Sequence, residues 1–283
     1  MTTQTYDTRA CELGEGPLWH PERQQLFWFD ILGKQLLSRD GDTPLAWEFD
    51  EYVSAAGWID RDTLMVASQT ALLRFDIASG DHEVITPLEA DNSVTRSNDG
   101  RADPAGGFWI GTMGIDAEPG AGAIHRYYKG ALEVLYPGIT VSNSICFAPD
   151  GTQAYYTDTR THQIMVQPLD AEGWPDGAPE VLIDLREEGL NPDGSVVDSE
   201  GGLWNAQWGA GRVARYLPDG SFDRAVAVPG LQATCPAFGG ADLRTMYVTS
   251  AAVGLSGPDS AQGCTFSTLP GVVGQAESQV ILA

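Results

Sequence analysis

Several residue types and patterns are scarce in this sequence of 283 residues, and each shortage narrows what the protein can be. Only 16 residues are Lys or Arg against 39 Asp or Glu, and the net charge of −23 repels nucleic-acid phosphates and anionic lipid headgroups. No apolar run approaches the roughly 18 residues that a membrane-spanning helix needs. We therefore expect a soluble protein with neither a nucleic-acid nor a membrane partner.

Cysteine is also scarce, and the start of the sequence is polar. The four cysteines are far apart and form no C-x-x-C pair: Cys11, Cys146, Cys235 and Cys264. The opening stretch MTTQTYDTRACELGEG lacks the apolar core of a secretion signal. In the absence of such a signal, reduced thiols and a cytoplasmic location are expected.

The common signatures of hydrolases and nucleotide-binding proteins are missing. The sequence contains no G-x-S-x-G elbow, no H-E-x-x-H pair, no Walker loop and no EF-hand loop. The four histidines fall at scattered positions, where we expect loops and outer strands: His20, His82, His125 and His162. A Ser–His–Asp triad is therefore not predicted.

Sustained helical periodicity is absent too, and a strand-rich repeat takes its place. Each copy has a short apolar strand, a turn of the Asp-Gly type and an aromatic-rich strand. Successive copies begin 41 to 50 residues apart, at Glu15, Ala56, Asn98, Asn143, Asp193 and Cys235. A period in the forties with about four strands per unit is typical of propeller blades. The sequence predicts an all-β, six-bladed β-propeller.

Turn and loop signals refine this prediction. Gly-containing turns separate the apolar runs at residues 149–151, 199–202 and 218–220. Residues 5–11 are expected to add a strand to the last blade, which closes the ring and leaves no long sheet edge exposed. Residues 173–179 (GWPDGAP) are expected to form a loop of the fourth blade. We predict one domain over residues 1–283.

The repeat also predicts a site. The innermost strands of a propeller run in one direction along the axis, so residues at one repeat position gather at one mouth of the channel. Four of the six opening residues carry carboxylates or amides: Glu15, Asn98, Asn143 and Asp193. Buried like charges resist ionisation unless a cation compensates them. Oxygen ligands of this kind suit one divalent ion, namely Ca, Zn, Mn, Mg or Fe(II).

A purely structural interpretation competes with this one. Asn and Asp are common turn residues, and Pro-Asp-Gly by itself is an ordinary turn sequence. The convergence of four such residues at one repeat position favours a site. Four tryptophans belong either to the core or to the channel mouth, with the core preferred: Trp19, Trp58, Trp109 and Trp208.

Five segments carry a family resemblance that extends from Leu13 to about Gly274. They are LGEGPLW (13–19), RSNDGRADPAGGFWIGTMG (96–114), VSNSICFAPDG (141–151), NPDGSVVDSEGGLWNA (191–206) and AFGG (237–240). These segments resemble the SMP-30/gluconolactonase family, which includes regucalcin. The last blade departs from the family, since GCTFSTLPGVVG only loosely matches its usual pattern.

The resemblance implies six blades, one divalent metal ion and a set of site residues. It assigns metal ligation to Glu15, Asn143 and Asp193, with Asp193 also the general base. It assigns sugar-ring contacts to Arg96 and Asn98. An acidic residue shortly after GTM faces the substrate in relatives, and Asp116 stands there with a side chain one methylene shorter than Glu.

The predicted function is divalent-metal-dependent hydrolysis of an aldonolactone, such as glucono-, xylono-, arabino- or galactonolactone, by a monomer. One alternative is an esterase or phosphotriesterase on the same scaffold, and another is a non-catalytic calcium-binding propeller. Two anchors also have structural alternatives. Arg96 could pair with Asp99 or Asp103, and Asn98 could cap a turn.

Overall fold

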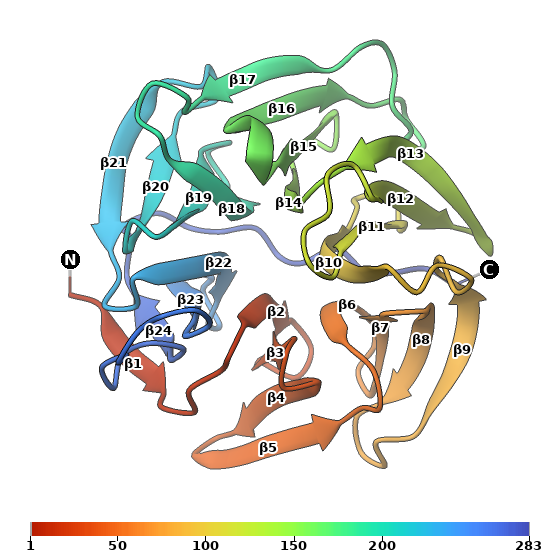
Figure 1. The fold of residues 1–283 in the computed structure, drawn as a ribbon, viewed down its shortest axis with the longest axis horizontal. Coiled ribbons are helices and arrows are strands. Elements are labelled where there is room, and N and C mark those ends of the chain that lie inside the picture. Colours follow the sequence, from red (N-terminus) through yellow and green to blue (C-terminus); the bar gives the residue numbers. More distant parts are fainter. Residues whose placement is uncertain (1, 283) are drawn as a thin grey trace.

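Six four-stranded antiparallel sheets ring a central axis in the computed structural model, which describes residues 2–282 (Figure 1). The predicted all-β, six-bladed propeller is therefore confirmed. Within the described residues, regular helix is confined to one three-residue 3-10 turn, η1 (Thr159–Thr161). No helix among residues 2–282 has the length and apolar character that a membrane crossing requires.

Each blade runs outward from the axis in four steps. The innermost strands are β2 (Gly14–His20), β6 (Val53–Asp60), β10 (Thr95–Ala102), β14 (Ser142–Phe147), β18 (Asn191–Val197) and β22 (Gln232–Gly239). The second strands are β3 (Gln25–Asp30), β7 (Thr63–Ser68), β11 (Phe108–Gly114), β15 (Gln153–Asp158), β19 (Leu203–Trp208) and β23 (Thr245–Ala251). The third strands are β4 (Gln35–Asp40), β8 (Ala71–Asp76), β12 (Gly122–Tyr128), β16 (Gln163–Pro168), β20 (Arg212–Tyr216) and β24 (Thr265–Thr268). The outermost strands are β5 (Thr43–Glu48), β9 (His82–Pro87), β13 (Ala131–Ile139), β17 (Glu180–Asp184), β21 (Phe222–Ala227) and β1 (Gln4–Asp7).

The ring closes through strands from opposite parts of the sequence. Strand β1 pairs antiparallel with β24, so the last blade has the order β1-β24-β23-β22. The predicted closing strand is confirmed, although it spans Gln4–Asp7 rather than residues 5–11. The predicted loop at 173–179 also lies in the fourth blade, between β16 and β17, where Pro175 makes a single bridge to Leu169.

Short polar turns connect the strands within a blade. The turn between β14 and β15 places Gly151 at φ 71°, and the carboxylate of Asp150 accepts hydrogen bonds from the amide and hydroxyl of Thr152. The turn between β20 and β21 repeats this arrangement with Gly220 and Asp219. Glycine adopts positive φ without steric cost, and Asp side chains satisfy turn amides, so these sequences favour hairpins.

Apolar side chains fill the space between neighbouring blades. The cluster between the first two blades is built around Phe27, Phe29 and Phe75, which are fully buried. Trp109 is buried in the third blade, as predicted for the core, whereas Trp208 is only partly buried. The four cysteines are buried and form no disulfide with one another. This packing supports the inner strands, which carry polar side chains at the axis.

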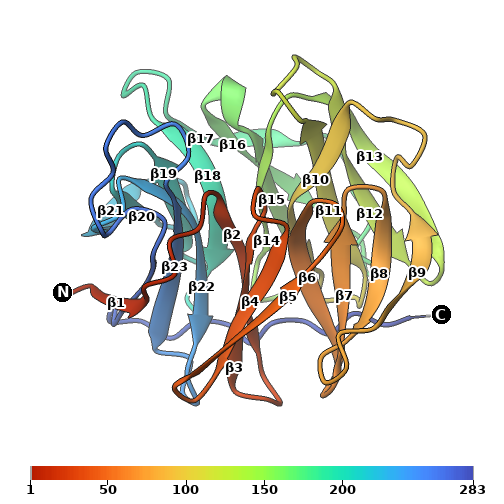
Figure 2. The same cartoon turned by 60° about the horizontal axis from the view of Figure 1, so that its bottom comes forward.

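Residues 270–282 cross the end of the ring that is remote from η1. Figure 2 shows this segment running beneath the inner strands toward the second and third blades. The amide of Ser199 donates to the carbonyl of Val273, and the amide of Ile281 donates to the carbonyl of Gly106. The segment therefore connects blades that are far apart in the sequence.

Candidate metal and substrate site

A bulge interrupts every inner strand near the same mouth of the channel. In the first and fourth blades it follows Glu15 and Asn143, which are the last residues paired with the second strand before the irregularity. In the third and fifth blades it follows Ser97 and Pro192, so Asn98 and Asp193 lie within the bulge itself. A bulge inserts an unpaired residue and changes the direction of its side chain.

The sequence alignment of the repeats was therefore wrong by one residue at Asn98 and Asp193. The six opening residues do not share a single register position, because the sequence pattern does not reveal where each bulge begins. Cys235 is the second residue of the bulge in its strand, one position further along than Asn98 and Asp193 in theirs. Ala56 is paired with Val66, between the two irregularities of its strand. The four polar residues nevertheless reach the same mouth, since the bulges turn neighbouring positions toward the axis.

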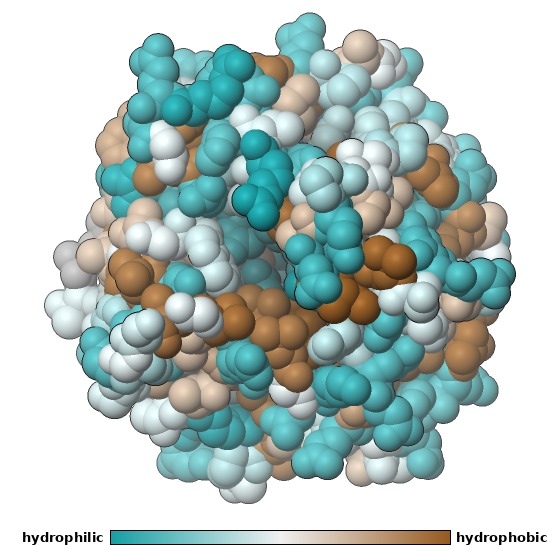
Figure 3. Space-filling view, viewed as in Figure 1, coloured by the Kyte–Doolittle hydropathy of each residue, from teal (hydrophilic) through white to brown (hydrophobic). Residues whose placement is uncertain are grey.

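A cavity of about 430 Å³ opens at this mouth. Five of the six predicted site residues line it: Glu15, Arg96, Asn98, Asn143 and Asp193. In the space-filling view the face is hollowed at its centre, with hydrophilic surface inside and hydrophobic side chains along the lower edge (Figure 3). A cavity of this size accommodates a small organic ligand.

The acidic side chains at the base of the cavity are crowded. Glu15, Asp99 and Asp193 are all buried, with at most 6% of each residue exposed. Burial, and then the charge of Asp99, raises the pKa of Glu15 to about 8. Burial, and then the charge of Glu15, raises the pKa of Asp193 well above its usual range. The protein alone therefore leaves this cluster poorly compensated, as expected where a cation binds.

The amide of Asn143 is held in one orientation. Its Nδ2 donates to Thr159 Oγ1 at 2.9 Å, and the Thr159 hydroxyl donates in turn to the carbonyl of Pro192 at 2.8 Å. Its Oδ1 accepts a hydrogen bond from Asn98 Nδ2 at 3.1 Å. The Asn143 oxygen has a second lone pair, so it is available as a ligand beside Glu15 and Asp193.

Arg96 places a second kind of polar group in the cavity. Its Nη1 donates to the carbonyl of Ser97 at 2.9 Å and to Asn98 Oδ1 at 2.8 Å, while its Nε is buried without a hydrogen-bond partner among the described residues. Burial lowers its pKa to about 10, so the guanidinium remains charged at neutral pH. Arg96 lines the cavity, so its positive charge is available to a polar ligand there.

The structural alternatives for Arg96 and Asn98 are wrong. Asp103 pairs with Arg126 at 2.7 Å, and Asp99 accepts a hydrogen bond from the amide of Ile145 at 2.7 Å. Neither carboxylate forms an ion pair with Arg96. Asn98 lies on β10 and bonds to the fourth blade through Asn143 and the carbonyl of Ser142, so it does not cap a turn.

Asp116 lies apart from the other predicted residues. It is exposed on the turn after β11, where its amide donates to Glu118 Oε2 at 3.1 Å. The neighbouring Met113 and Ile115 line the cavity, but Asp116 is not among the lining residues. The structure does not bring its side chain to the cluster, and its substrate contact remains a prediction.

Two lining residues were not predicted from the sequence, because they lie at the ends of second strands. Met113 lies near the end of β11 and Thr159 follows β15, and these strands run antiparallel to the inner strands and finish at the same mouth. Trp208, for which the core was the preferred location, ends β19 at this mouth as well. The antiparallel repeat was the signal that could have found them. Trp208 therefore belongs to the mouth rather than to the core. Apolar residues complete the wall: Leu13, Leu32, Ile115, Val141 and Val253.

The donor set fits a hard divalent cation. Among residues 2–282 no three His, Cys, Asp or Glu side chains form a group that could hold a metal by themselves. Glu15 and Asp193 supply two carboxylates, and the oriented amide oxygen of Asn143 supplies a third ligand. Carboxylate and amide oxygens are the ligands that Ca²⁺, Mg²⁺ and Mn²⁺ prefer.

Comparison with known proteins decides the family. The model of the SMP-30/Gluconolactonase/LRE-like region matches residues 13–252. The chain belongs to this family. A putative sugar lactone lactonase of Rhizobium meliloti is 40% identical over 255 residues, covering 89% of this chain and 86% of that protein. An L-arabinolactonase of Azospirillum brasilense is 40% identical over 263 residues, covering 90% of this chain and 86% of that protein.

A solved structure resembles the whole fold. The crystal structure of a calcium-binding protein, regucalcin, from Agrobacterium tumefaciens superposes with a TM-score of 0.97 at 39% identity. The superposition covers 99% of this chain and 98% of the regucalcin chain. This member of the SMP-30/gluconolactonase family therefore shares its overall fold with a protein described as a calcium-binding protein.

Proposed function

We propose that this chain hydrolyses a sugar lactone to the sugar acid, with one divalent metal ion held by Glu15, Asn143 and Asp193. The single observation that carries the proposal is the shared cavity. Two crowded carboxylates and an oriented amide oxygen lie beside Arg96 and Asn98, and all five residues line one opening. The names of the lactonase relatives support the substrate class.

The residues of this chain account for binding and proton transfer. Arg96 and Asn98 lie within the cavity and orient the ring through its hydroxyl groups, which lowers the entropic part of the barrier. Asp193 accepts a proton from the attacking water as the water oxygen bonds to the lactone carbonyl carbon. The ring C–O bond then breaks, and the proton passes to the released ring oxygen, leaving a hydroxy acid. A bound divalent ion supplies a Lewis acid that stabilises negative charge on the carbonyl oxygen.

The proposed metal is one divalent ion, with Ca, Zn, Mn, Mg and Fe(II) as the candidates. The calcium-binding regucalcin that resembles this chain supports calcium as one of them. The all-oxygen donor set supports Ca²⁺, Mg²⁺ and Mn²⁺ in particular. The same residues would hold each candidate ion. The metal is therefore identified by adding each ion back to protein from which metal has been removed.

A second candidate function is hydrolysis of a less polar ester by the same centre. The apolar wall favours it, because Leu32, Met113 and Ile115 present hydrocarbon rather than hydrogen-bonding groups to a ligand. Arg96 and Asn98 favour a polyol instead, since both are polar side chains that line the cavity. Hydrolysis rates on lactones, on an aromatic ester and on a phosphotriester distinguish these two functions.

The test starts from protein stripped of metal with a chelator. Each candidate metal is added back, and acid release is followed on glucono-, xylono-, arabino- and galactonolactone, with an aromatic ester and a phosphotriester beside them. We expect metal-dependent hydrolysis of at least one lactone. Activity only on the esters establishes the second candidate, whereas metal binding without any hydrolysis shows a non-catalytic calcium-binding propeller and refutes both.

A further inference from the structure

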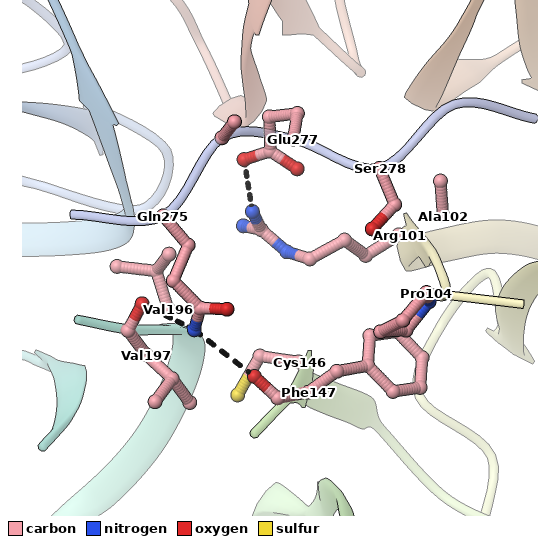
Figure 4. Close-up of a pocket in the computed structure, with 11 residues that line it drawn as sticks. Arg101, Ala102, Pro104, Cys146, Phe147, Val196, Val197, Gln275, Glu277 and Ser278 are labelled. Atoms are coloured by element: carbon pink, nitrogen blue, oxygen red, sulfur yellow. Dashed lines mark hydrogen bonds and ion pairs between the residues drawn. The ribbon is translucent and has the colours of Figure 1, made fainter. Parts of the chain in front are cut away.

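The segment Gln275–Leu282, here called the strap, closes the channel at the end opposite the cavity (Figures 2 and 4). Gln275 Nε2 donates to the carbonyls of Phe147 and Val197, at 3.2 and 2.9 Å. Trp58 Nε1 donates to the carbonyl of Glu277 at 2.9 Å. The strap thus contacts the second, fourth and fifth blades near the axis.

One side chain of the strap enters the ring and forms an ion pair with a buried guanidinium group. The Glu277 carboxylate accepts a hydrogen bond from Arg101 Nη1, and the two side chains are 7% and 11% exposed (Figure 4). Burial acts to lower the pKa of Arg101, but the charge of Glu277 raises it, and the pKa lies above its usual value. Glu277 therefore keeps a charged guanidinium fixed inside the channel.

Arg101 in turn spans the channel to a blade that is not its neighbour. It lies on β10 of the third blade, and its Nη2 donates to the carbonyl of Ser195 on β18 of the fifth blade at 3.3 Å. The fourth blade lies between these two strands in the ring (Figure 1). A guanidinium presents several donors in a rigid plane, so it can bind Glu277 and Ser195 at once.

Ser195 belongs to the segment that carries the proposed ligand and base. It follows Asp193 by two residues and closes the bulge of β18. Its hydroxyl donates to Ser144 Oγ at 3.0 Å, and Ser144 Oγ donates to the carbonyl of Asp193 at 2.6 Å. Asn205 Nδ2 also donates to the carbonyl of Asp193, at 3.0 Å. Contacts from β10, β14 and β19 therefore hold this backbone.

We propose that Glu277 and Arg101 are positioning residues of the metal centre, which fix the bulge of β18 so that Asp193 meets Glu15 and Asn143. The proposal depends on the proposed role of Asp193 as ligand and base. According to this proposal, the strap positions residues of the metal centre in addition to covering the end of the channel. Removing a group that orients a metal ligand, without itself binding the metal, typically lowers metal affinity or activity about 10- to 100-fold.

The informative variant removes both charges together. Breaking a buried ion pair on one side leaves an unpaired charge that destabilises the fold, whereas replacing both partners avoids that penalty. The double variant Arg101→Met/Glu277→Gln therefore keeps the fold and loses the contact to Ser195. Arg101→Lys keeps the charge without the planar fork. Gln279→Ala is the matched control, because Gln279 ties the strap to the carbonyl of Ile59 and does not contact Arg101.

Three measurements on the full chain report on the position of β18. In the double variant we expect amide hydrogen exchange at residues 194–197 to accelerate about tenfold, and Mn²⁺ affinity measured by calorimetry to fall about tenfold. The turnover number should fall by a similar factor at nearly unchanged KM. Arg101→Lys should give intermediate values, and Gln279→Ala should match the unmodified protein.

Exchange and Mn²⁺ affinity within twofold of the Gln279→Ala values, in a double variant that unfolds as cooperatively as the unmodified protein, overturn the proposal. If the double variant does not fold, Arg101→Lys, which keeps the buried charge paired with Glu277, is measured in the same way and judged by the same limits. Exchange in metal-free protein requires neither metal nor lactone. A chain that hydrolyses no lactone therefore refutes the proposed function while the exchange data still decide the positioning role.

Discussion

Thr159 Oγ1 accepts a hydrogen bond from Asn143 Nδ2 at 2.9 Å, and this contact leaves the Asn143 oxygen on the side of Asn98. Thr159 forms no hydrogen bond with a carboxylate of the site, yet its contact selects which atom of the Asn143 amide would face the proposed metal ion. Replacing it with valine should lower metal affinity about tenfold, since the amide can then rotate. Calorimetric titration with Mn²⁺ checks this, and Thr159→Ser, which keeps the hydroxyl, should retain the original affinity. Equal losses in both variants would contradict the orienting role.

Asp193 and Asp150 provide a natural pair for testing the base. Both stand in a Pro-Asp-Gly sequence, but Asp193 is buried at the axis and Asp150 is exposed in a hairpin turn. Asp193→Asn should reduce kcat/KM on the order of 10²- to 10⁴-fold with the fold retained, because both a ligand and a proton acceptor are lost. Asp150→Asn should change kcat/KM less than twofold, since only turn hydrogen bonds are altered. Steady-state kinetics and circular dichroism measure the two effects, and an active Asp193→Asn protein refutes the assignment.

Glu15→Gln should separate metal binding from fold stability. Burial and the neighbouring Asp99 raise the pKa of Glu15 to about 8, so in the folded metal-free protein this carboxyl either takes up a proton or carries an uncompensated charge, and both lower stability above the ordinary pKa of Glu. The neutral amide of Gln should therefore raise the Tm of the metal-free protein, by about 2–4 °C for each kcal/mol of this cost removed. The stabilisation that added metal gives to the unmodified protein should disappear at the same time. Thermal unfolding with and without Ca²⁺ tests both statements. A lower Tm in the metal-free variant would show that Glu15 is structurally required rather than electrostatically costly.

His20 predicts how stability depends on pH. Contrary to expectation it lies on an innermost strand, at the end remote from the cavity, where its Nε2 contacts the carbonyl of Asp60 at 3.0 Å. Burial lowers its pKa below the usual 6.5, so below that pH the unfolded chain takes up a proton before the folded chain does. The contribution of His20 to stability should therefore fall as pH decreases from 6.5 through the lowered pKa.

Denaturant unfolding between pH 8 and pH 5 measures this slope. His20→Gln should flatten the slope below pH 6.5, and replacement of the exposed His82 on β9 should leave it unchanged. A slope that is identical in the unmodified protein and in His20→Gln would assign the acid sensitivity to other groups, among them the buried His125, whose pKa burial also lowers.

The fold could be predicted because its information is repetitive and local. Each blade repeats the same turns and apolar strands, so Gly151 and Gly220 mark equivalent hairpins without knowledge of the rest of the chain. Closure by β1 followed from the need to satisfy the edge of the last blade. No long-range geometry was required beyond the number of repeats.

The site was predictable only in part, because its details depend on contacts between blades. Glu15, Asn143 and Asp193 could be found from their place in the repeat and the family resemblance. The bulges that move Asn98 and Asp193 by one position leave no mark in a repeat alignment. The bond between Arg101 and Ser195 joins residues 94 positions apart, and nothing in either local sequence predicts it.

Strand β1 has a consequence for how the protein is made. It lies at the outside of a sheet whose other strands come from residues 232–268, although it precedes them by more than 220 residues. Its partner β24 is synthesised more than 250 residues later, so β1 has to remain unpaired until then. Pairings of such sequence separation form slowly. We infer that the sixth blade is the last to assemble, and that the growing chain is most exposed to aggregation just before it does.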